Sequence, residues 1–387
     1  MSRAPVESSG KPPKKSSSSP PWYGPRIWMG MTASAWFPYL ARHGFRVAPS
    51  RWFSAASISL SSITNSGLFV LTKALYGRKV DATEIRHPPV FILGHWRSGT
   101  TLLHELFYCD PQFTCPTVYQ CTAPSHFLVS ERVALRFLRW LAPSRRAMDN
   151  MDLGLDRPQE EDFALANLGL RNPYSTIGFP NDGPQDDAFF ELDDAPPEQR
   201  ATFERLFLHF LKSVAYRQQD KRFALKSPPH TFRIPFLLKL FPDARFIHIV
   251  RDPYTVFPST VHLWKTLYQT QGMQIPTYEG VEEYVLKTYE RMMQRVDDTK
   301  ALIAPNRYSE VRYEDLVANP LETIRSLYER LSLGDFENAR PGVETYLQSH
   351  KDYKTNRYKL TPEQRASIEQ RWGKYIERWG YTAPPAE

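Results

Sequence analysis

From residue 88 onward, short apolar runs alternate with longer segments in which apolar residues recur every three or four positions. The short runs predict β-strands at 89–93, 222–226 and 245–250. A helix-like segment follows each of the three runs, and further helices are predicted at 131–141, 198–217, 281–303, 320–332 and 361–379. This alternation predicts an α/β fold with a mostly parallel sheet and helices on both of its faces.

The first twenty residues differ from the rest of the chain. Residues 1–20 are rich in Ser, Pro and Lys and contain no apolar core, so they predict a disordered tail. They also lack the apolar segment of a signal peptide.

Residues 21–87 predict a helical N-terminal extension for which two interpretations stay open. No charged residue occurs between Arg51 and Lys73, yet Ser and Thr are too frequent there for a transmembrane helix. The first interpretation is a helix packed on the main domain through apolar residues at near-helical spacing, namely Leu60, Ile63, Leu68 and Leu71. The second is a helical pair in a membrane interface, anchored by Trp22, Trp28, Trp36 and Trp52, in which residues 21–75 make peripheral membrane contact. We expect a cytoplasmic protein in both cases.

The run that ends at residue 93 leads into Gly94-His-Trp-Arg-Ser-Gly99-Thr-Thr, which opens directly into an apolar helix-like segment. A strand–turn–helix of this kind directs backbone N–H groups and the positive helix end at one point, where an anion can bind. The two glycines have the spacing of a nucleotide-binding P-loop, but Thr100 stands where the lysine is expected. The segment therefore predicts a phosphate-binding loop that does not grip the terminal phosphates of ATP.

Residues 222–260 contain two further predicted strand ends, each followed by Pro and a helix. Lys226, Ser227 and His230 lie at the first end. Arg251 lies at the second, and Ser259 follows it along the chain. Because open α/β sheets bind ligands at the carboxyl ends of their strands, we expect the loop and both clusters to converge on one crevice.

Composition narrows the classes of partner. A chain of 387 residues can form one large α/β domain with additions, or two domains. The net charge of +7 suits anionic small molecules, acidic polymers or an acidic membrane surface. No Lys/Arg run stands beside aromatic residues, so no nucleic-acid partner is expected. Cys109, Cys115 and Cys121 form no CxxC pair, which favours buried thiols in a reducing compartment over a disulfide scaffold or a zinc site.

Taken together, these motifs resemble those of sulfotransferases that use 3′-phosphoadenosine 5′-phosphosulfate (PAPS), a group that includes tyrosylprotein sulfotransferases and many bacterial members. WRSGTTLL at 96–103 is similar to the 5′-phosphosulfate loop, and RDPYTVFPS at 251–259 to the 3′-phosphate motif. LKSP at 225–228 resembles the strand end that supplies a catalytic lysine, and VRYEDLVANP at 311–320 resembles a segment ahead of the last core helices. The resemblance implies a P-loop-type parallel sheet flanked by helices over residues 88–335, with 336–387 supplying a loop and a helix that complete the nucleotide site.

The resemblance also implies roles for individual residues in a reaction that needs no metal. Positioning and charge stabilisation should dominate sulfuryl transfer, by analogy with phosphoryl transfer. Lys226 would contact the bridging or sulfuryl oxygens. The 5′-phosphate would be held by Arg97 and by the N–H groups of Ser98, Gly99, Thr100 and Thr101. Arg251 and Ser259 would bind the 3′-phosphate, whereas Asp252 is expected to orient the turn rather than to bind magnesium.

The general base stays open at this point. Tyrosylprotein sulfotransferases place a glutamate after the loop arginine, where this chain has CPTVYQC and no carboxylate. The substitutes are the acidic cluster Glu160, Glu161 and Asp162, which the start of a helix also explains, together with His230 and His104. His104 falls at a position that more often serves packing. We favour Glu161 or Glu160 as the base, with His230 second.

Two further groups are candidates for ligand contacts. A late basic loop closes over the nucleotide in the family, and a solvated surface loop is an equally good explanation of the residues here, Tyr353, Lys354, Asn356 and Arg357. Contacts to the acceptor are expected after the loop helix, at Tyr119, Gln120 and His126.

The leading hypothesis is therefore a PAPS-dependent sulfotransferase that acts on a hydroxyl or amine of a small-molecule, lipid, glycan or peptide acceptor. One alternative is a P-loop nucleotide kinase or other phosphotransferase, against which Thr100 and the pair Arg251 and Ser259 argue. The other is a non-catalytic nucleotide-binding module, which a missing base would favour.

Overall fold

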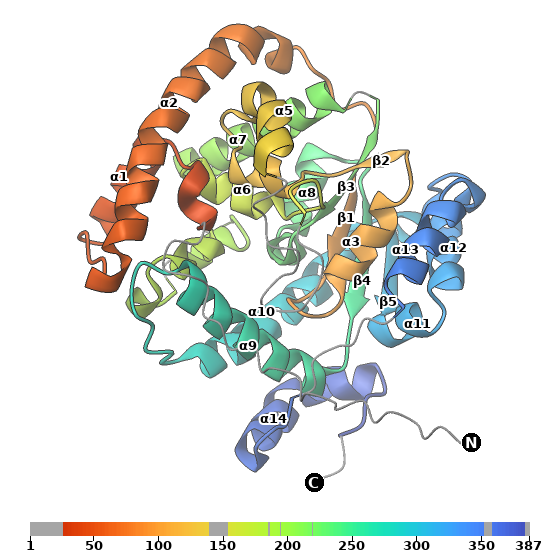
Figure 1. The fold of residues 1–387 in the computed structure, drawn as a ribbon. Coiled ribbons are helices and arrows are strands. Elements are labelled where there is room, and N and C mark those ends of the chain that lie inside the picture. Colours follow the sequence, from red (N-terminus) through yellow and green to blue (C-terminus); the bar gives the residue numbers. More distant parts are fainter. Residues whose placement is uncertain are drawn as a thin grey trace, which may run out of the picture.

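The computed structural model describes residues 26–138, 154–184, 186–193, 195–218, 220–351 and 358–383. The tail predicted at 1–20 lies outside these residues. Within them, a central parallel sheet is covered by helices on both faces, as the sequence predicts (Figure 1).

The sheet has five strands in the order β2-β3-β1-β4-β5, and every neighbouring pair is parallel. The strands are β1 (Val90–Leu93), β2 (Phe113–Thr114), β3 (Arg222–Lys226), β4 (Arg245–Val250) and β5 (Tyr308–Arg312). All four residues of β1 are buried. This burial agrees with its place at the centre of the sheet, between β3 and β4.

Alternate residues of β1 contribute to two different cores. Phe91 and Leu93 pack with α5 (Phe127–Leu138), α6 (Glu161–Asn167), α7 (Pro197–Arg217) and α8 (Ile234–Leu240). Val90 and Ile92 pack with α3 (Thr100–Tyr108), α11 (Tyr313–Ala318), α12 (Pro320–Leu331) and α13 (Arg340–Ser349). Because successive side chains of a strand point to opposite faces, one short apolar strand holds both helical layers in place (Figure 1).

A third core contains no strand residue among its described members. It joins α9 (Pro253–Gln271), α10 (Val281–Thr299) and α14 (Pro362–Arg378) to the N-terminal residues Trp28 and Trp36. In this core the ring of Trp372 stacks on that of Tyr289 with 3.9 Å between centroids. This stack fixes α14 on α10, and α14 also packs against α9, the helix that carries Ser259.

The predicted elements are close to the observed ones where the apolar signal is strong. The strands predicted at 222–226 and 245–250 have the observed bounds, and the helix predicted at 198–217 begins one residue earlier. The strands β2 and β5 are not predicted. The first has two residues, and the second, YSEVR, is only partly buried at the edge of the sheet.

The N-terminal extension is helical and contains η1 (Ile27–Gly30), α1 (Ala33–Arg42) and the long α2 (Trp52–Asp81). The short helix α4 (Val118–Thr122) of the main domain packs against η1. The prediction that α2 packs through its leucine and isoleucine positions is wrong, because Leu60, Ile63 and Leu71 are exposed. Ser62 and Asn65 are buried instead. Polar groups on this side of the helix bond to backbone atoms of η1 and to the loop after it, and these bonds set which side faces inward.

Candidate active site

Three neighbouring strands bring the predicted ligand groups to one edge of the sheet. The loop 94–99 follows β1, Lys226 is the last residue of β3, and Arg251 directly follows β4. Because β1 lies between β3 and β4 and all three are parallel, their carboxyl ends lie at the same edge of the sheet, where open α/β sheets bind ligands.

The loop between β1 and α3 has a backbone that depends on its two glycines. Gly94 has φ +145° and Gly99 has φ +102°, and between them Arg97 adopts φ +70°. A Cβ on Gly94 would lie 2.6 Å from the Ile249 carbonyl oxygen, and one on Gly99 would lie 2.3 Å from the ring of Tyr313. The chain can therefore make this turn against β4 and Tyr313 only with glycine at both positions.

Internal hydrogen bonds close the loop. The N–H and the hydroxyl of Ser98 both donate to the His95 carbonyl oxygen, at 3.1 and 2.7 Å. His95 Nδ1 donates to the Trp96 carbonyl oxygen, and burial lowers the pKa of His95 to about 3. Since Ser98 uses both donors within the loop, the groups aimed outward are the first-turn N–H groups of α3, which have no partner inside the helix.

The two predicted phosphate-binding clusters touch each other. Arg97 Nε donates to Ser259 Oγ at 2.9 Å, and Arg251 Nη1 donates to the Arg97 carbonyl oxygen at 3.0 Å. The guanidinium of Arg251 also lies 4.1 Å from the ring centroid of Tyr313, and burial lowers the pKa of Arg251. The loop after β1 and the start of α9 thus form a single positively charged site, as the sequence predicts from topology.

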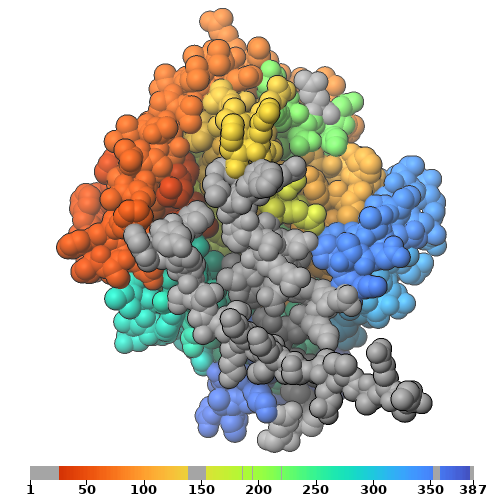
Figure 2. Space-filling view, viewed as in Figure 1, coloured from red at the N-terminus to blue at the C-terminus, as the bar shows by residue number. Residues whose placement is uncertain are grey.

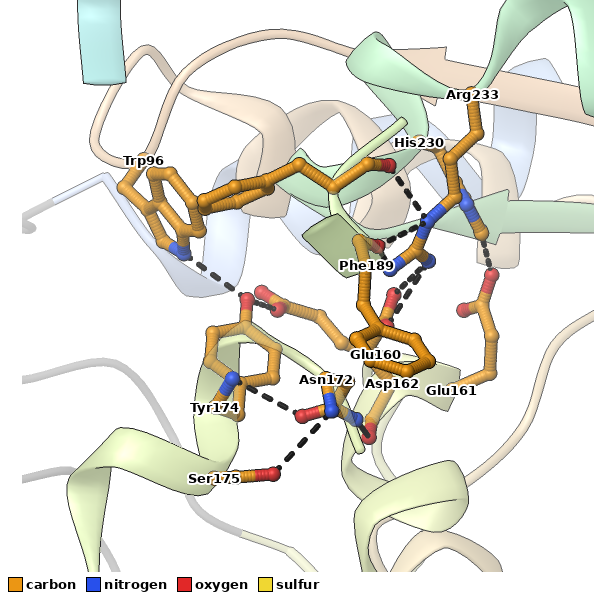
Figure 3. Close-up of polar contacts among 11 residues, drawn as sticks. Trp96, Glu160, Glu161, Asp162, Asn172, Tyr174, Ser175, Phe189, His230 and Arg233 are labelled. Atoms are coloured by element: carbon orange, nitrogen blue, oxygen red, sulfur yellow. Dashed lines mark hydrogen bonds and ion pairs between the residues drawn. The ribbon is translucent and has the colours of Figure 1, made fainter. Parts of the chain in front are cut away.

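A buried polar chain connects the end of β3 to the acidic cluster. Lys226 Nζ donates to Glu160 Oε1 at 2.5 Å, and the Tyr174 hydroxyl donates to Glu160 Oε2. Trp96 Nε1, from the loop after β1, donates to the Tyr174 hydroxyl at 2.9 Å (Figure 3). Burial, followed by the Glu160 charge, raises the pKa of Tyr174 far above its usual range, so the phenol keeps its proton and serves as a donor.

The other two carboxylates of the cluster belong to closed internal pairs. His230 Nε2 donates to Glu161 Oε1, and the Glu161 side chain is fully buried. Arg233 Nη1 donates to both carboxylate oxygens of Asp162 at 3.0 Å, while the rest of the guanidinium bonds to the backbone carbonyl oxygens of residues 189 and 190 (Figure 3). The Glu160 side chain, by contrast, is 13% exposed, which makes it the most accessible carboxylate of the three.

Several other candidates have structural partners. Asp252 caps α9 by accepting from the Tyr254 N–H and the Thr255 hydroxyl, which agrees with its expected role in the turn. His104 Nε2 donates to the Ala224 carbonyl oxygen on β3, as expected of a packing position.

The residues proposed for acceptor contacts serve the packing of α4 and α5. The Tyr119 hydroxyl donates to Ser130 Oγ, and Gln120 Nε2 donates to Glu131 Oε1. His126 Nε2 donates to Asn65 Oδ1 on α2. These three residues therefore link helices to one another.

The late basic loop is only partly visible. Tyr353, Lys354, Asn356 and Arg357 lie outside the described residues. Tyr358, which follows them directly, has its ring 5.6 Å from that of His262, one turn beyond Ser259 on α9. Tyr358 therefore lies beside α9, close to Ser259 along that helix.

Sequence reasoning missed Tyr174 and Trp96, which complete the chain to Glu160. It also missed the pairing of the acidic cluster with three basic residues from one segment. The available signal was spacing: Lys226, His230 and Arg233 follow one another at intervals of four and three residues, opposite three consecutive carboxylates. Among the described residues, no group of three or more His, Cys, Asp and Glu side chains is placed to hold a metal ion.

Comparisons with known proteins point to one family. The model of the sulfotransferase family matches residues 88–337. The chain is 46% identical over 360 residues to the omega-hydroxy-beta-dihydromenaquinone-9 sulfotransferase Stf3 of Mycobacterium tuberculosis, which covers 93% of this chain and 92% of that protein. It is also 28% identical to mouse carbohydrate sulfotransferase 5, over 83% of each chain.

Solved structures with the same fold are sulfotransferases as well. STF9 from Mycobacterium avium superposes with a TM-score of 0.64 at 18% identity, covering 92% of this chain and 98% of that one. STF1 from Mycobacterium tuberculosis gives a TM-score of 0.58 at 18% identity, covering 89% and 94%. At this identity the likeness establishes the fold alone.

Proposed function

This chain belongs to the sulfotransferase family, and from that premise we propose that it transfers the sulfuryl group of PAPS to a terminal hydroxyl of an apolar lipid. The choice of PAPS as the donor rests on the contact between the two arginine clusters. Arg97 donates a hydrogen bond to Ser259, and Arg251 donates one to the Arg97 carbonyl oxygen. PAPS carries phosphate at both its 5′ and 3′ positions, and a site of two linked arginines suits a nucleotide with two phosphate groups.

The 5′-phosphate side of the donor would lie against the start of α3. The first-turn N–H groups of Gly99, Thr100 and Thr101 and the positive end of the helix can receive the charge that builds on the leaving phosphate. Ser98 would act indirectly, because its two donors keep the loop closed on His95. The 3′-phosphate would bind Arg251 and Ser259.

Lys226 would act on the group in transfer. Its ammonium is buried at the end of β3 and has three N–H donors, of which one bonds to Glu160. A further donor can reach the bridging or sulfuryl oxygens of a donor bound at the neighbouring loop. This arrangement supplies positive charge where negative charge develops.

Glu160 is the general base of this proposal. Lys226 and Tyr174 each donate a hydrogen bond to one of its oxygens, and the two bonds fix the position of the carboxylate. Glu161 has a weaker claim, since it is fully buried and paired with His230. An acceptor hydroxyl could reach Glu160 from the crevice and lose its proton to it as the oxygen attacks sulfur.

The acceptor class is supported by the 46% identical relative, whose name gives an omega-hydroxylated dihydromenaquinone as its substrate. The identity extends over 93% of this chain and so includes the segments that surround the crevice. A long apolar molecule with a hydroxyl at its end is therefore the acceptor we propose.

The donor is tested by thermal stabilisation. Adenosine 3′,5′-bisphosphate, the product left by the donor, should raise the melting temperature, because at one hundred times its Kd a ligand adds about 2.7 kcal/mol of stability. ATP with magnesium should raise it much less. Equal stabilisation by the two nucleotides would overturn the donor assignment.

The acceptor is tested with radiolabelled PAPS. Purified protein should label a polyisoprenoid quinone that carries a terminal hydroxyl and should leave the same quinone without the hydroxyl unlabelled. Labelling of a glycan or a tyrosine peptide in place of the lipid would contradict the acceptor while leaving the donor assignment intact.

A further inference from the structure

The long helix α2 has its polar side directed to the protein and its apolar side directed to solvent. The buried positions are Ser54, Ile58, Ser62, Asn65 and Val80. The exposed side chains include Leu60 at 70%, Ile63 at 61% and Val70 at 66%. This is the reverse of the arrangement that a soluble surface helix normally has.

Specific hydrogen bonds hold the helix in this orientation. Asn65 Nδ2 donates to the carbonyl oxygens of Met29 and Met31, and Asn65 Oδ1 accepts from His126. Ser59 Oγ accepts from Trp36 Nε1, and Ser66 Oγ accepts from the Ala33 N–H at the start of α1. Turning the apolar side inward would break all of these bonds, so the apolar side stays outside.

The outward face is regular over most of the helix. Positions 53, 56, 60, 63, 67, 70, 74 and 78 are all exposed and recur at intervals of three or four residues, as the positions of one helix face do. Only the last of them, Arg78, is polar. From residue 53 to residue 74 this apolar stripe spans about 32 Å along the helix. Contiguous apolar surface of this extent marks an interaction site rather than scattered exposure.

Positive charges predominate along α2, in which the last residue, Asp81, is the one acidic residue. No Asp or Glu occurs between Glu7 and Asp81, whereas Lys73, Arg78 and Lys79 lie exposed in the last turns of α2. The neighbouring helix α5 also exposes Val133 and Phe137 next to Arg132 and Arg136. Figure 2 shows α2, in orange, along the rim of the molecule at the upper left.

We propose that this face of α2 docks on an anionic lipid bilayer, with the helix lying in the headgroup region parallel to the membrane. Apolar side chains would enter the acyl boundary while the basic residues at the end of the helix meet anionic headgroups. The proposal does not depend on the acceptor proposed above, because it rests on a surface helix and needs no turnover.

Other occupants fit the observations less well. A second copy of this chain would bring the same positive charges to the interface in either relative direction, since basic residues stand at both ends of α2. Among the described residues, α2 is also the one helix long and apolar enough to cross a membrane. A spanning helix, however, would have to release the bonds that Asn65, Ser59 and Ser66 make to the rest of the protein.

The test is flotation of the full chain with vesicles, without donor or acceptor. Wild-type protein should float with vesicles of equimolar phosphatidylcholine and phosphatidylglycerol and should float less with phosphatidylcholine alone. The variant L60E/I63E/V70E should partition at least about tenfold more weakly, since three carboxylates replace apolar groups in the interface. A matched control places three glutamates at exposed apolar positions elsewhere, as I275E/L302E/V317E, and should float like the wild type.

Several results would overturn the proposal. Wild-type protein that stays with the soluble fraction, or a triple α2 variant that floats as well as the wild type, would each exclude lipid docking by this face. A lipid-free wild-type dimer that the α2 substitutions convert to a monomer in sedimentation would assign the face to a second copy instead. If adenosine 3′,5′-bisphosphate stabilises the variant, the variant has folded. The same measurement tests the proposed donor site independently of membrane docking.

Discussion

Replacing Glu160 with Gln tests whether this carboxylate, rather than its neighbour Glu161, removes the acceptor proton. The two residues are adjacent in sequence, so E160Q and E161Q make the same chemical change one position apart. Their environments differ: the Glu160 side chain is 13% exposed and bonds to Lys226, and the Glu161 side chain is fully buried against His230. E161Q is therefore a matched control for E160Q.

The size of each effect follows from the hydrogen bonds. Both oxygens of Glu160 accept, one from Lys226 and the other from Tyr174. An amide offers a single acceptor oxygen, so E160Q leaves one of these donors without its partner and should lower the unfolding free energy by about 1–3 kcal/mol. Loss of the base should lower kcat by about 10²- to 10⁴-fold.

E161Q should behave differently. Only one oxygen of Glu161 accepts a hydrogen bond in the described structure, from His230 Nε2, and an amide oxygen can take over that bond. We expect a stability loss of about 1 kcal/mol and a kcat within about threefold of the wild type. The shorter carboxylate of E160D should recover part of the activity that E160Q loses.

The assay is steady-state transfer from labelled donor at saturating acceptor, with nucleotide binding measured by calorimetry. E160Q should bind adenosine 3′,5′-bisphosphate as the wild type does, because Arg97, Arg251 and Ser259 are unchanged. If E160Q keeps wild-type turnover, or if E161Q loses as much turnover as E160Q, Glu160 is not the base.

Three further predictions concern the loop and the nucleotide site. Ser259→Ala should weaken nucleotide binding by about tenfold in calorimetry, since it removes both a proposed ligand contact and the acceptor of Arg97 Nε. An unchanged Kd would contradict a nucleotide site shared by Arg97 and Ser259. Gly99→Ala should lower the unfolding free energy in urea by at least about 2 kcal/mol, because its Cβ would lie 2.3 Å from the Tyr313 ring at a φ of +102°, whereas an unchanged midpoint would mean that the turn is not strained. Burial lowers the pKa of His95 to about 3 in the folded protein, so between pH 6.5 and pH 3 only the unfolded chain takes up a proton at this group. As pH falls through this range, His95 should therefore lower the unfolding free energy by up to about 1.4 kcal/mol per pH unit. Urea titrations at pH 7 and pH 5 should show a smaller loss for His95→Gln than for the wild type, and equal losses would refute the effect.

The sequence predicts those parts of the fold in which the spacing of apolar residues matches the positions that are buried. β1, β3 and β4 are short apolar runs because they lie inside the sheet, and the glycines after β1 mark a turn that other residues cannot make. The rule that parallel strands share a ligand edge then suffices to place Lys226 and Arg251 together. The edge strand β5 escapes prediction because Glu310 and Arg312 interrupt its apolar residues.

Helix α2 shows what periodicity leaves undecided. Its apolar positions predict a helix, and a helix is observed over Trp52–Asp81. Which side faces the protein is set by partners far away in the chain, such as the carbonyl oxygens of Met29 and Met31 and the ring of His126. A serine-rich side of a helix can face the protein when backbone acceptors lie opposite it. Those acceptors are distant in sequence, so the pattern within the helix does not reveal them.

The acidic cluster shows the same limit at the site itself. Glu160, Glu161 and Asp162 lie at the start of a helix, and successive side chains of a helix diverge by about 100°. Each therefore meets a different basic residue, at the end of β3 or in the segment after it. Three like residues therefore acquire three different environments, and only Glu160, at the N-cap of α6, keeps part of its side chain accessible. The choice between adjacent glutamates depends on how deeply α6 is set against η6 (Pro228–Phe232), which is a property of the packed fold. Depth of burial, rather than residue type or spacing, is thus what favours Glu160 as the base.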